Sequence, residues 1–145
     1  MKKRAVVIFA YKDELLLVKR KKGDLNYYCF PGGTVEENEN IKNAALREIE
    51  EELNYCIQGS LKEIIYLNKK DINEESFYFY KDLNDAFEPK LKHNSPEFKK
   101  ISDNYLFEPV WINYSSIKNL NIFPIPIKNL LLKIHPREIK EKIIL

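Results

Sequence analysis

The chain has 145 residues, which is enough for one domain with a hydrophobic core. Hydrophobic residues make up 44% of it, a share that excludes an intrinsically disordered protein. The formal net charge is only +2, so strong non-specific binding to nucleic acid, which needs a basic surface, is not expected. Cys29 and Cys56 have apolar neighbours and are too few for a secreted disulfide framework, so we expect both to be free and buried.

Membrane and export signals are missing from the sequence. No stretch approaches the ~20 apolar residues of a membrane-spanning helix, and the apolar run at 5–10 is short and has no cleavage site after it. A cytoplasmic protein without a membrane partner is the expectation. The basic runs at 2–4 and 19–22 are interpreted as solvated edges of the fold, with a rim that attracts phosphate as the alternative.

The first third of the chain predicts three strands. Ala5–Tyr11 and Glu14–Lys19 are rich in β-formers and are separated by a turn at Lys12-Asp13. A short aromatic strand, Tyr27–Phe30, ends at Pro31-Gly32-Gly33. Adjacent glycines at a strand end allow a sharp turn and let the backbone approach a ligand closely.

A helix and two strands are predicted in the middle of the chain. Asn40–Leu53 consists mostly of strong helix formers. Cys56–Asn68 and Ser76–Asp82 have the composition of strands and are expected to pair antiparallel. The polar segment 84–103 contains two prolines and predicts a long loop, and such loops often have a function.

The last third predicts one strand and one helix. Tyr105–Asn113 is a strand that Pro109 confines to an edge or a bulge. The segment from Ile125 to about His135 is amphipathic, and Pro136 ends it. Both segments are either core or a dimer contact, so the sequence leaves a monomer and a homodimer open. No internal repeat or domain boundary is visible, and we expect a single domain over 1–145.

The predicted central helix carries an acidic stripe. Glu48, Glu51 and Glu52 occupy positions i, i+3 and i+4 and therefore share one side of the helix, bordering its apolar face. Like charges at this spacing cost about 0.2–0.5 kcal/mol per pair, and more when they lose water. A hard divalent cation such as Mg²⁺, which prefers oxygen ligands, would offset this cost. The alternative is a solvated acidic face balanced by Arg47 and nearby lysines.

The spacing around this stripe is specific. Gly33 is followed after five residues by Glu39, and after seven more by Arg47-Glu48-Ile49-x-Glu51-Glu52. This arrangement, with the preceding Pro31-Gly32, resembles the motif of the Nudix (MutT-like) pyrophosphohydrolases. It departs from that motif where Asn38 and Asn54 replace glycines. Asparagine is the best non-glycine residue for left-handed backbone at helix ends, so both positions are predicted to be left-handed.

The resemblance implies an α/β fold, namely an α/β/α sandwich with a mixed β-sheet and a loop–helix–loop catalytic motif. It also implies Mg²⁺- or Mn²⁺-dependent hydrolysis of a pyrophosphate bond in a nucleoside diphosphate derivative. A nucleoside triphosphate or another small nucleotide is the residual choice of substrate. By the same analogy the metal ligands are the carboxylates of Glu48, Glu51 and Glu52 and the backbone carbonyl of Gly32. The analogy gives a structural role to three further motif residues, namely Gly33, Glu39 and Arg47.

Hydrolysis also needs a group that accepts a proton from the attacking water. Glu52, with Glu48 beside it, is one candidate. Glu97, in the sequence Asn94-Ser95-Pro96-Glu97, is the other, because this stretch resembles a distal loop of bacterial family members. An exposed loop acid that takes no part in the reaction is the alternative for Glu97.

Substrate-binding residues are less well determined by the sequence. Tyr28, Phe77 and Tyr80 are candidates to stack on a base, and core packing is the alternative for each. Arg4 is a candidate phosphate ligand or else a surface cation. Two other functions remain open at this point, a catalytically silent nucleotide- or RNA-binding module on the same fold and an acidic-helix interaction domain without metal.

Overall fold

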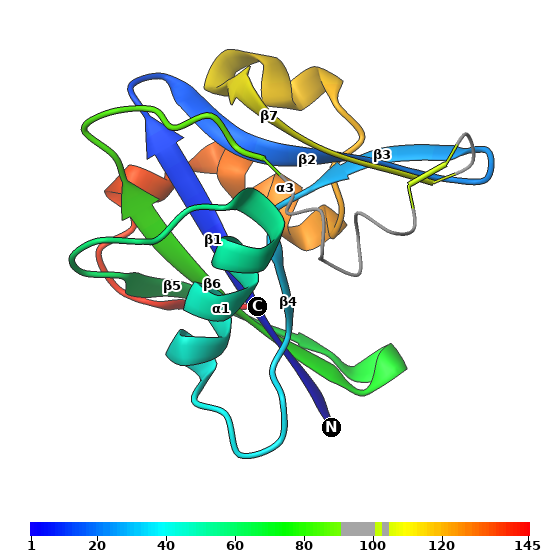
Figure 1. The fold of residues 1–145 in the computed structure, drawn as a ribbon, viewed down its shortest axis with the longest axis vertical. Helices are drawn as coiled ribbons and strands as arrows, with labels where there is room; N and C mark the ends of the chain where they lie inside the picture. Colours follow the sequence, from blue (N-terminus) through cyan, green and yellow to red (C-terminus); the bar gives the residue numbers. More distant parts are fainter. Residues whose placement is uncertain (91–100, 103–104) are drawn as a thin grey trace.

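The computed structural model describes residues 1–90, 101–102 and 105–145 and is built around one mixed β-sheet (Figure 1). The strands are β1 (Lys2–Tyr11), β2 (Glu14–Lys22), β3 (Leu25–Cys29), β4 (Gly32–Thr34), β5 (Lys62–Lys69), β6 (Glu74–Asp82), β7 (Tyr105–Asn113) and β8 (Ile143–Ile144). Their order is β3-β2-β1-β6-β5-β8, with β4 also paired to β1 and β7 to β2. The β1–β6 pair is parallel and the β1–β2 pair is antiparallel. The predicted α/β class with a mixed sheet is therefore confirmed.

Helices cover both faces of this sheet. They are α1 (Ile41–Leu53) and α3 (Ile125–Lys133), with short 3₁₀ turns η1 (Lys70–Ile72), η2 (Tyr114–Asn119) and η3 (Pro136–Glu138). Because side chains alternate along a strand, the apolar run of β1 serves two cores. Val7 and Phe9 pack with α1, whereas Val6 and Ile8 pack with α3. None of the helices in the described part of the chain has the length and apolar character needed to span a bilayer.

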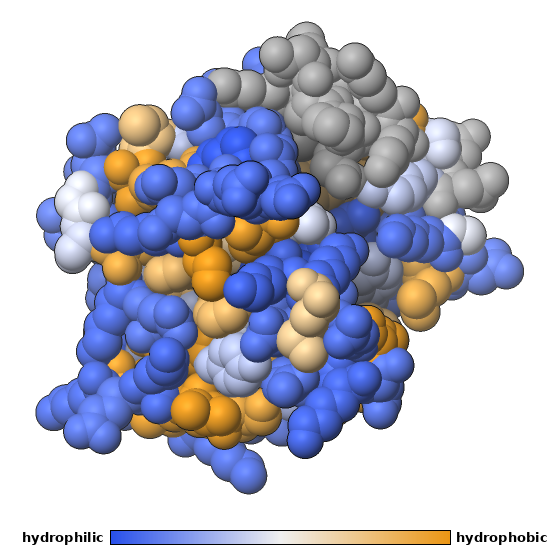
Figure 2. Space-filling view, turned by 90° about the horizontal axis from the view of Figure 1, so that it is seen from below, coloured by the Kyte–Doolittle hydropathy of each residue, from blue (hydrophilic) through white to orange (hydrophobic). Residues whose placement is uncertain are grey.

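The sheet divides along β1. The N-terminal part of β1 pairs with β4, with Arg4 opposite Thr34 and Val6 opposite Gly32. Only its C-terminal end, at Ala10 and Tyr11, pairs with β2. The β2–β3 hairpin and β4 therefore diverge, and a cavity lies where they separate. Polar side chains cover most of the molecular face seen in Figure 2, with smaller hydrophobic groups between them.

Local structure at the ends of α1 follows the sequence. Asn40 caps the helix, because its Oδ1 accepts hydrogen bonds from the backbone N–H groups of Lys42 and Asn43. Asn38 has φ +65° and Asn54 has φ +52°. Both asparagines adopt the left-handed backbone predicted for them, which confirms that replacing glycine there preserves the chain path.

Three expectations about the elements are corrected. The strand predicted from Cys56 begins only at Lys62, because Gly59 has φ +79° and interrupts extended structure before it. Cys56 lies in this connection and is exposed rather than buried. The last helix ends at Lys133, and His135 instead caps η3 by accepting a hydrogen bond from the backbone N–H of Arg137.

Candidate active site

A cavity of about 970 Å³ lies between α1, β4, the first half of β1 and the β2–β3 hairpin. Its lining brings together the carboxylates of α1, several arginines and lysines, and a group of aromatic side chains. These residues come from segments far apart in the sequence, from Lys2 to Pro124. The division of the sheet is thus what assembles the candidate site.

The acidic stripe of α1 forms one wall of the cavity, at Glu48, Glu51 and Glu52. Glu52 is only 6% exposed, and the side chains of Glu48 and Glu51 are 13% and 43% exposed. The stripe therefore borders the core, as its position on the helical wheel requires, and two of the three carboxylates are largely removed from water.

Gly33 makes the position of Glu48 possible. A Cβ at residue 33 would lie 2.2 Å from the carboxyl carbon of Glu48 and 2.4 Å from one of its oxygens. Real Cβ atoms do not come so close to other heavy atoms. The carboxylate can rest against the β4 backbone only because residue 33 has no side chain.

Arg47 joins the motif loop to the helix. Its Nε and Nη2 donate hydrogen bonds of 2.8 and 2.9 Å to the two carboxylate oxygens of Glu39, and Nη2 also donates to the carbonyl of Thr34. The hydrogen bond from Arg47, followed by one from the backbone N–H of Glu36, lowers the pKa of Glu39 to about 2. This geometry is what the structural role expected for Glu39 and Arg47 requires.

Arg47 also contacts the acidic stripe. Its Nη1 lies 2.9 Å from Glu48 Oε1 and 3.5 Å from Glu51 Oε2. Among the described residues, no three acidic, histidine or cysteine side chains converge tightly enough to form a metal site as they stand. The donor chemistry nevertheless fits a hard cation, because Glu48, Glu51, Glu52 and Gly32 line one cavity and offer only oxygen ligands.

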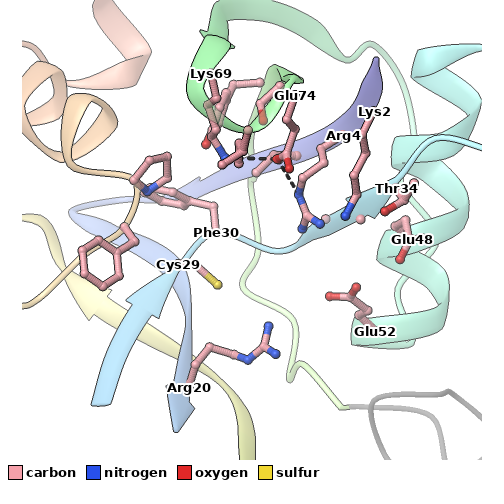
Figure 3. A pocket seen from close by; sticks show the side chains of 18 of the residues that line it. Lys2, Arg4, Arg20, Cys29, Phe30, Thr34, Glu48, Glu52, Lys69 and Glu74 are labelled. Carbon is pink, nitrogen blue, oxygen red and sulfur yellow. Dashed lines mark hydrogen bonds and ion pairs between the residues drawn. The ribbon is translucent and has the colours of Figure 1, made fainter. Parts of the chain in front are cut away.

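Basic side chains face the acidic wall across the cavity (Figure 3). Lys2 extends from β1 to the side of Thr34, Arg4 extends from β1 into the middle of the cavity, and Arg20 extends from β2 toward Glu52. Opposite charges therefore flank the open space, an arrangement suited to an anionic ligand bound through cations on one side and carboxylate-held metal on the other.

Aromatic residues complete the lining. Tyr27 and Phe123 lie with their ring centroids 5.6 Å apart, and the phenol of Tyr105 accepts a hydrogen bond of 2.7 Å from Arg20. The Arg20 guanidinium also lies over the Tyr105 ring, 5.3 Å from its centroid. Burial raises the pKa of the Cys29 thiol, and nearby Arg20 partly opposes that shift.

The substrate-binding residues suggested by the sequence fall in different places. Arg4 lines the cavity, whereas Tyr28, Phe77 and Tyr80 do not. Tyr28 and Phe77 each alternate with cavity residues along β3 and β6, so they face the other way. Tyr80 shares a face with Ser76 but lies farther along β6, against the core under α3. Glu97 lies outside the described residues.

Several cavity residues have no signal in the local sequence. Glu74 and Ser76 enter the lining because the start of β6 pairs in parallel with the start of β1, and Lys69 enters because the end of β5 pairs with Glu74. Phe123 enters because the segment before α3 returns to β3, where the backbone N–H of Phe123 donates to the carbonyl of Tyr28. Only long-range pairing could have identified them.

Comparison with known proteins agrees with this geometry. The family model described as a NUDIX domain matches residues 1–130. A putative 8-oxo-dGTP diphosphatase of Bacillus subtilis (strain 168) is 36% identical over 74 residues, which are 51% of this chain. The matched part spans about half, 48%, of that relative's length.

Solved structures share the fold. A MutT protein from Bacillus halodurans superposes with a TM-score of 0.68 at 20% identity, covering 97% of this chain and 86% of the other. A NUDIX hydrolase from Nitrosomonas europaea gives a TM-score of 0.69 at 21% identity, covering 99% and 76%. The fold and the motif-bearing helix at the cavity define a protein of the Nudix class. With the family model matched over residues 1–130, the chain belongs to the Nudix family.

Proposed function

We propose that this chain hydrolyses a pyrophosphate bond in a nucleoside triphosphate or another small nucleotide, using water and a divalent cation, Mg²⁺ or Mn²⁺. The proposal rests on one observation above all. The carboxylates of a Nudix motif and a set of arginines and lysines line the same cavity, and Glu52 is nearly buried there. Hydrolysis of a polyphosphate needs both kinds of group, because the negative charge of the phosphates repels the lone pair with which water attacks.

In this proposal Glu48, Glu51 and Glu52 hold the cation, with the carbonyl of Gly32 as a further oxygen ligand. Such a cation would supply positive charge to offset the negative charge of the phosphoryl oxygens and would make an attacking water easier to deprotonate. Of the described carboxylates, Glu52 is our choice for the proton acceptor, because burial keeps it away from bulk water. Glu97 remains the second candidate for this role.

The remaining motif residues position this set. Arg47 on the helix bonds Glu39 on the loop and the carbonyl of Thr34 in β4, so loop and helix cannot separate without breaking these contacts. Its hydrogen bond to Glu48, the next residue of the same helix, orients that carboxylate. Arg20 and Lys2 extend into the cavity from other strands and are suited to bind phosphate oxygens. Binding and orientation of the polyphosphate are therefore the tasks of groups outside the motif.

The test compares Glu52→Gln with a matched control, Glu50→Gln. Glu50 lies on the same helix but is exposed and does not line the cavity. Both variants are assayed for pyrophosphate and phosphate release on a nucleotide panel with Mg²⁺ or Mn²⁺, including the 8-oxo-dGTP named for the Bacillus subtilis relative. We expect Glu52→Gln to retain its melting temperature and lose turnover by about 10²-fold or more, and Glu50→Gln to behave as wild type.

The silent binding module is distinguished by the same panel. If wild-type protein binds Mg²⁺ and nucleotide by calorimetry but releases no product from any member, the catalytic proposal is wrong and the binding module is correct. If it binds neither, the acidic-helix interaction domain without metal is the better description.

A further inference from the structure

A charged group lies in the cavity apart from the Nudix motif. We call the surface formed by Arg4, Lys69, Glu74 and Ser76 the cavity floor. Glu74, at the start of β6, is 7% exposed, and its Oε1 lies 3.2 Å from Lys69 Nζ and 3.7 Å from Arg4 Nε. All three residues line the cavity. The buried carboxylate lies between two cations, and its ion pair with Nε draws that edge of the Arg4 guanidinium toward Glu74.

The terminal amino groups of Arg4 are left for a ligand. Its Nε is on the side of Glu74, and the rest of the guanidinium projects away from Glu74 into the cavity (Figure 3). Within the described residues, those terminal nitrogens donate to no protein acceptor. A guanidinium has only hydrogen-bond donors, so a ligand group that binds these nitrogens must be a hydrogen-bond acceptor.

Ser76 supplies a second, independent sign of a ligand. It is 1% exposed, lines the cavity, and stands beside Arg4 on the neighbouring parallel strand. Its Oγ has no hydrogen-bond partner in the part of the chain that the structure describes. A buried hydroxyl without a partner is costly, and a bound molecule that reaches the floor would satisfy it.

The floor suits a nucleobase better than a phosphate. Glu74 partly neutralises both Arg4 and Lys69, so these cations attract an anion less strongly than unpaired cations would, whereas a neutral base needs only hydrogen-bond donors. Tyr27 and Phe123 line the same cavity and offer apolar, planar contacts that a base requires. A base with a carbonyl on its edge would accept hydrogen bonds from Arg4, while an amino group there would bring donor against donor.

We propose that Arg4 is a specificity-determining residue that chooses between nucleobases. It selects bases with a carbonyl over bases with an amino group at the edge that faces the cavity floor. Glu74 and Lys69 position its side chain, and Ser76 assists it. This inference rests on the proposed function, because it describes how that substrate's base is chosen. It assigns a role in substrate choice to residues outside the Nudix motif.

The test uses nucleotide pairs that differ in one exocyclic group of the base and in the proton on the adjacent ring nitrogen. dITP has a carbonyl at C6 and a proton on N1, where dATP has an amino group and no proton; dUTP and dCTP differ likewise at C4 and N3. We expect wild-type kcat/KM to favour the carbonyl member of at least one pair by roughly 5- to 150-fold, the range for one good bidentate contact. Arg4→Met is expected to bring that ratio close to one by losing activity on the carbonyl member alone.

Controls separate this role from simpler ones. Lys3→Met removes a charge from the next residue of the same strand, which is exposed and outside the cavity, and should keep the wild-type ratio. Glu74→Gln should lower the ratio while kcat on the amino member stays the same, which loss of structure alone would not produce. Ser76→Ala is a milder change at a second position and should lower the ratio by a few-fold.

Two results would overturn the inference. One is a wild-type ratio near one in both pairs, and the other is an Arg4→Met variant that loses equal activity on both members, which would make Arg4 a phosphate ligand. If no nucleotide is hydrolysed at all, the proposed function is wrong, but calorimetry with dIMP and dAMP still tests base selection by Arg4. Equal affinity of the wild-type protein for these two monophosphates would then refute that selection.

Discussion

Substituting alanine at the two adjacent glycines of the motif should produce opposite defects. At Gly32 an added Cβ would lie 2.2 Å from the carbonyl oxygen of Ala5 and 2.7 Å from the Cα of Val6, which are backbone atoms of β1. At Gly33 the three atoms nearest to the added Cβ all belong to the carboxylate of Glu48, at the end of a flexible side chain. Backbone in a sheet cannot move aside, whereas a side chain can rotate.

The magnitudes follow from these contacts. Gly32→Ala should cost about 3 kcal/mol, at the upper end for overpacking, and lower the melting temperature by roughly 6–12 °C. Gly33→Ala should cost about 1 kcal/mol. To reach the 3.4 Å of ordinary contact from 2.2 Å, the Glu48 carboxylate must shift by about 1.2 Å. A misplacement of this size costs about 10²-fold in rate, or about 2.7 kcal/mol in the barrier.

The assay measures the melting temperature of each variant by calorimetry and kcat/KM on the best nucleotide substrate at saturating Mg²⁺. Gly23→Ala is the control for kcat/KM, because an added Cβ there meets nothing within 4 Å; its φ of +58° strains alanine, so a small drop in melting temperature is expected without loss of activity. Wild-type kcat/KM in Gly33→Ala, or a wild-type melting temperature in Gly32→Ala, would contradict these expectations.

Two further predictions concern the ends of the motif. Asn54→Gly should change stability by less than about 1 kcal/mol in urea denaturation and leave activity intact, since glycine readily adopts the observed φ of +52°; a loss of several kcal/mol would contradict this. The second prediction concerns pH. Hydrogen bonding to Arg47 lowers the pKa of Glu39 from 4.5 to about 2. The Arg47–Glu39 pair therefore stabilises the fold fully above about pH 4.5, and this stabilisation is lost as the pH falls toward 2. Glu39→Gln should therefore be less stable than wild type at neutral pH, with the difference shrinking toward pH 2 in urea titrations; a difference independent of pH would refute the assignment.

Features that depend on neighbours along the chain could be predicted from the amino-acid sequence. Helical periodicity placed Glu48, Glu51 and Glu52 on one stripe beside the apolar face, and the structure shows that stripe at the edge of the core. The left-handed backbone at Asn38 and Asn54 was also predictable, because it depends on the residue type at a helix end. The motif spacing identified the family for the same reason, since it lies within one loop and one helix.

The residues that lie opposite the acidic stripe are brought there by long-range strand pairing. The parallel register of β1 and β6 sets Arg4 beside Ser76 and Lys2 beside Glu74, and strand alternation directs Phe77 away from the cavity. Pairing between strands some 70 residues apart leaves no local pattern, because each strand's composition is compatible with several partners and registers. The helix that bears the motif could therefore be predicted from one stretch of sequence, whereas the cavity floor that faces it is a product of how the sheet divides.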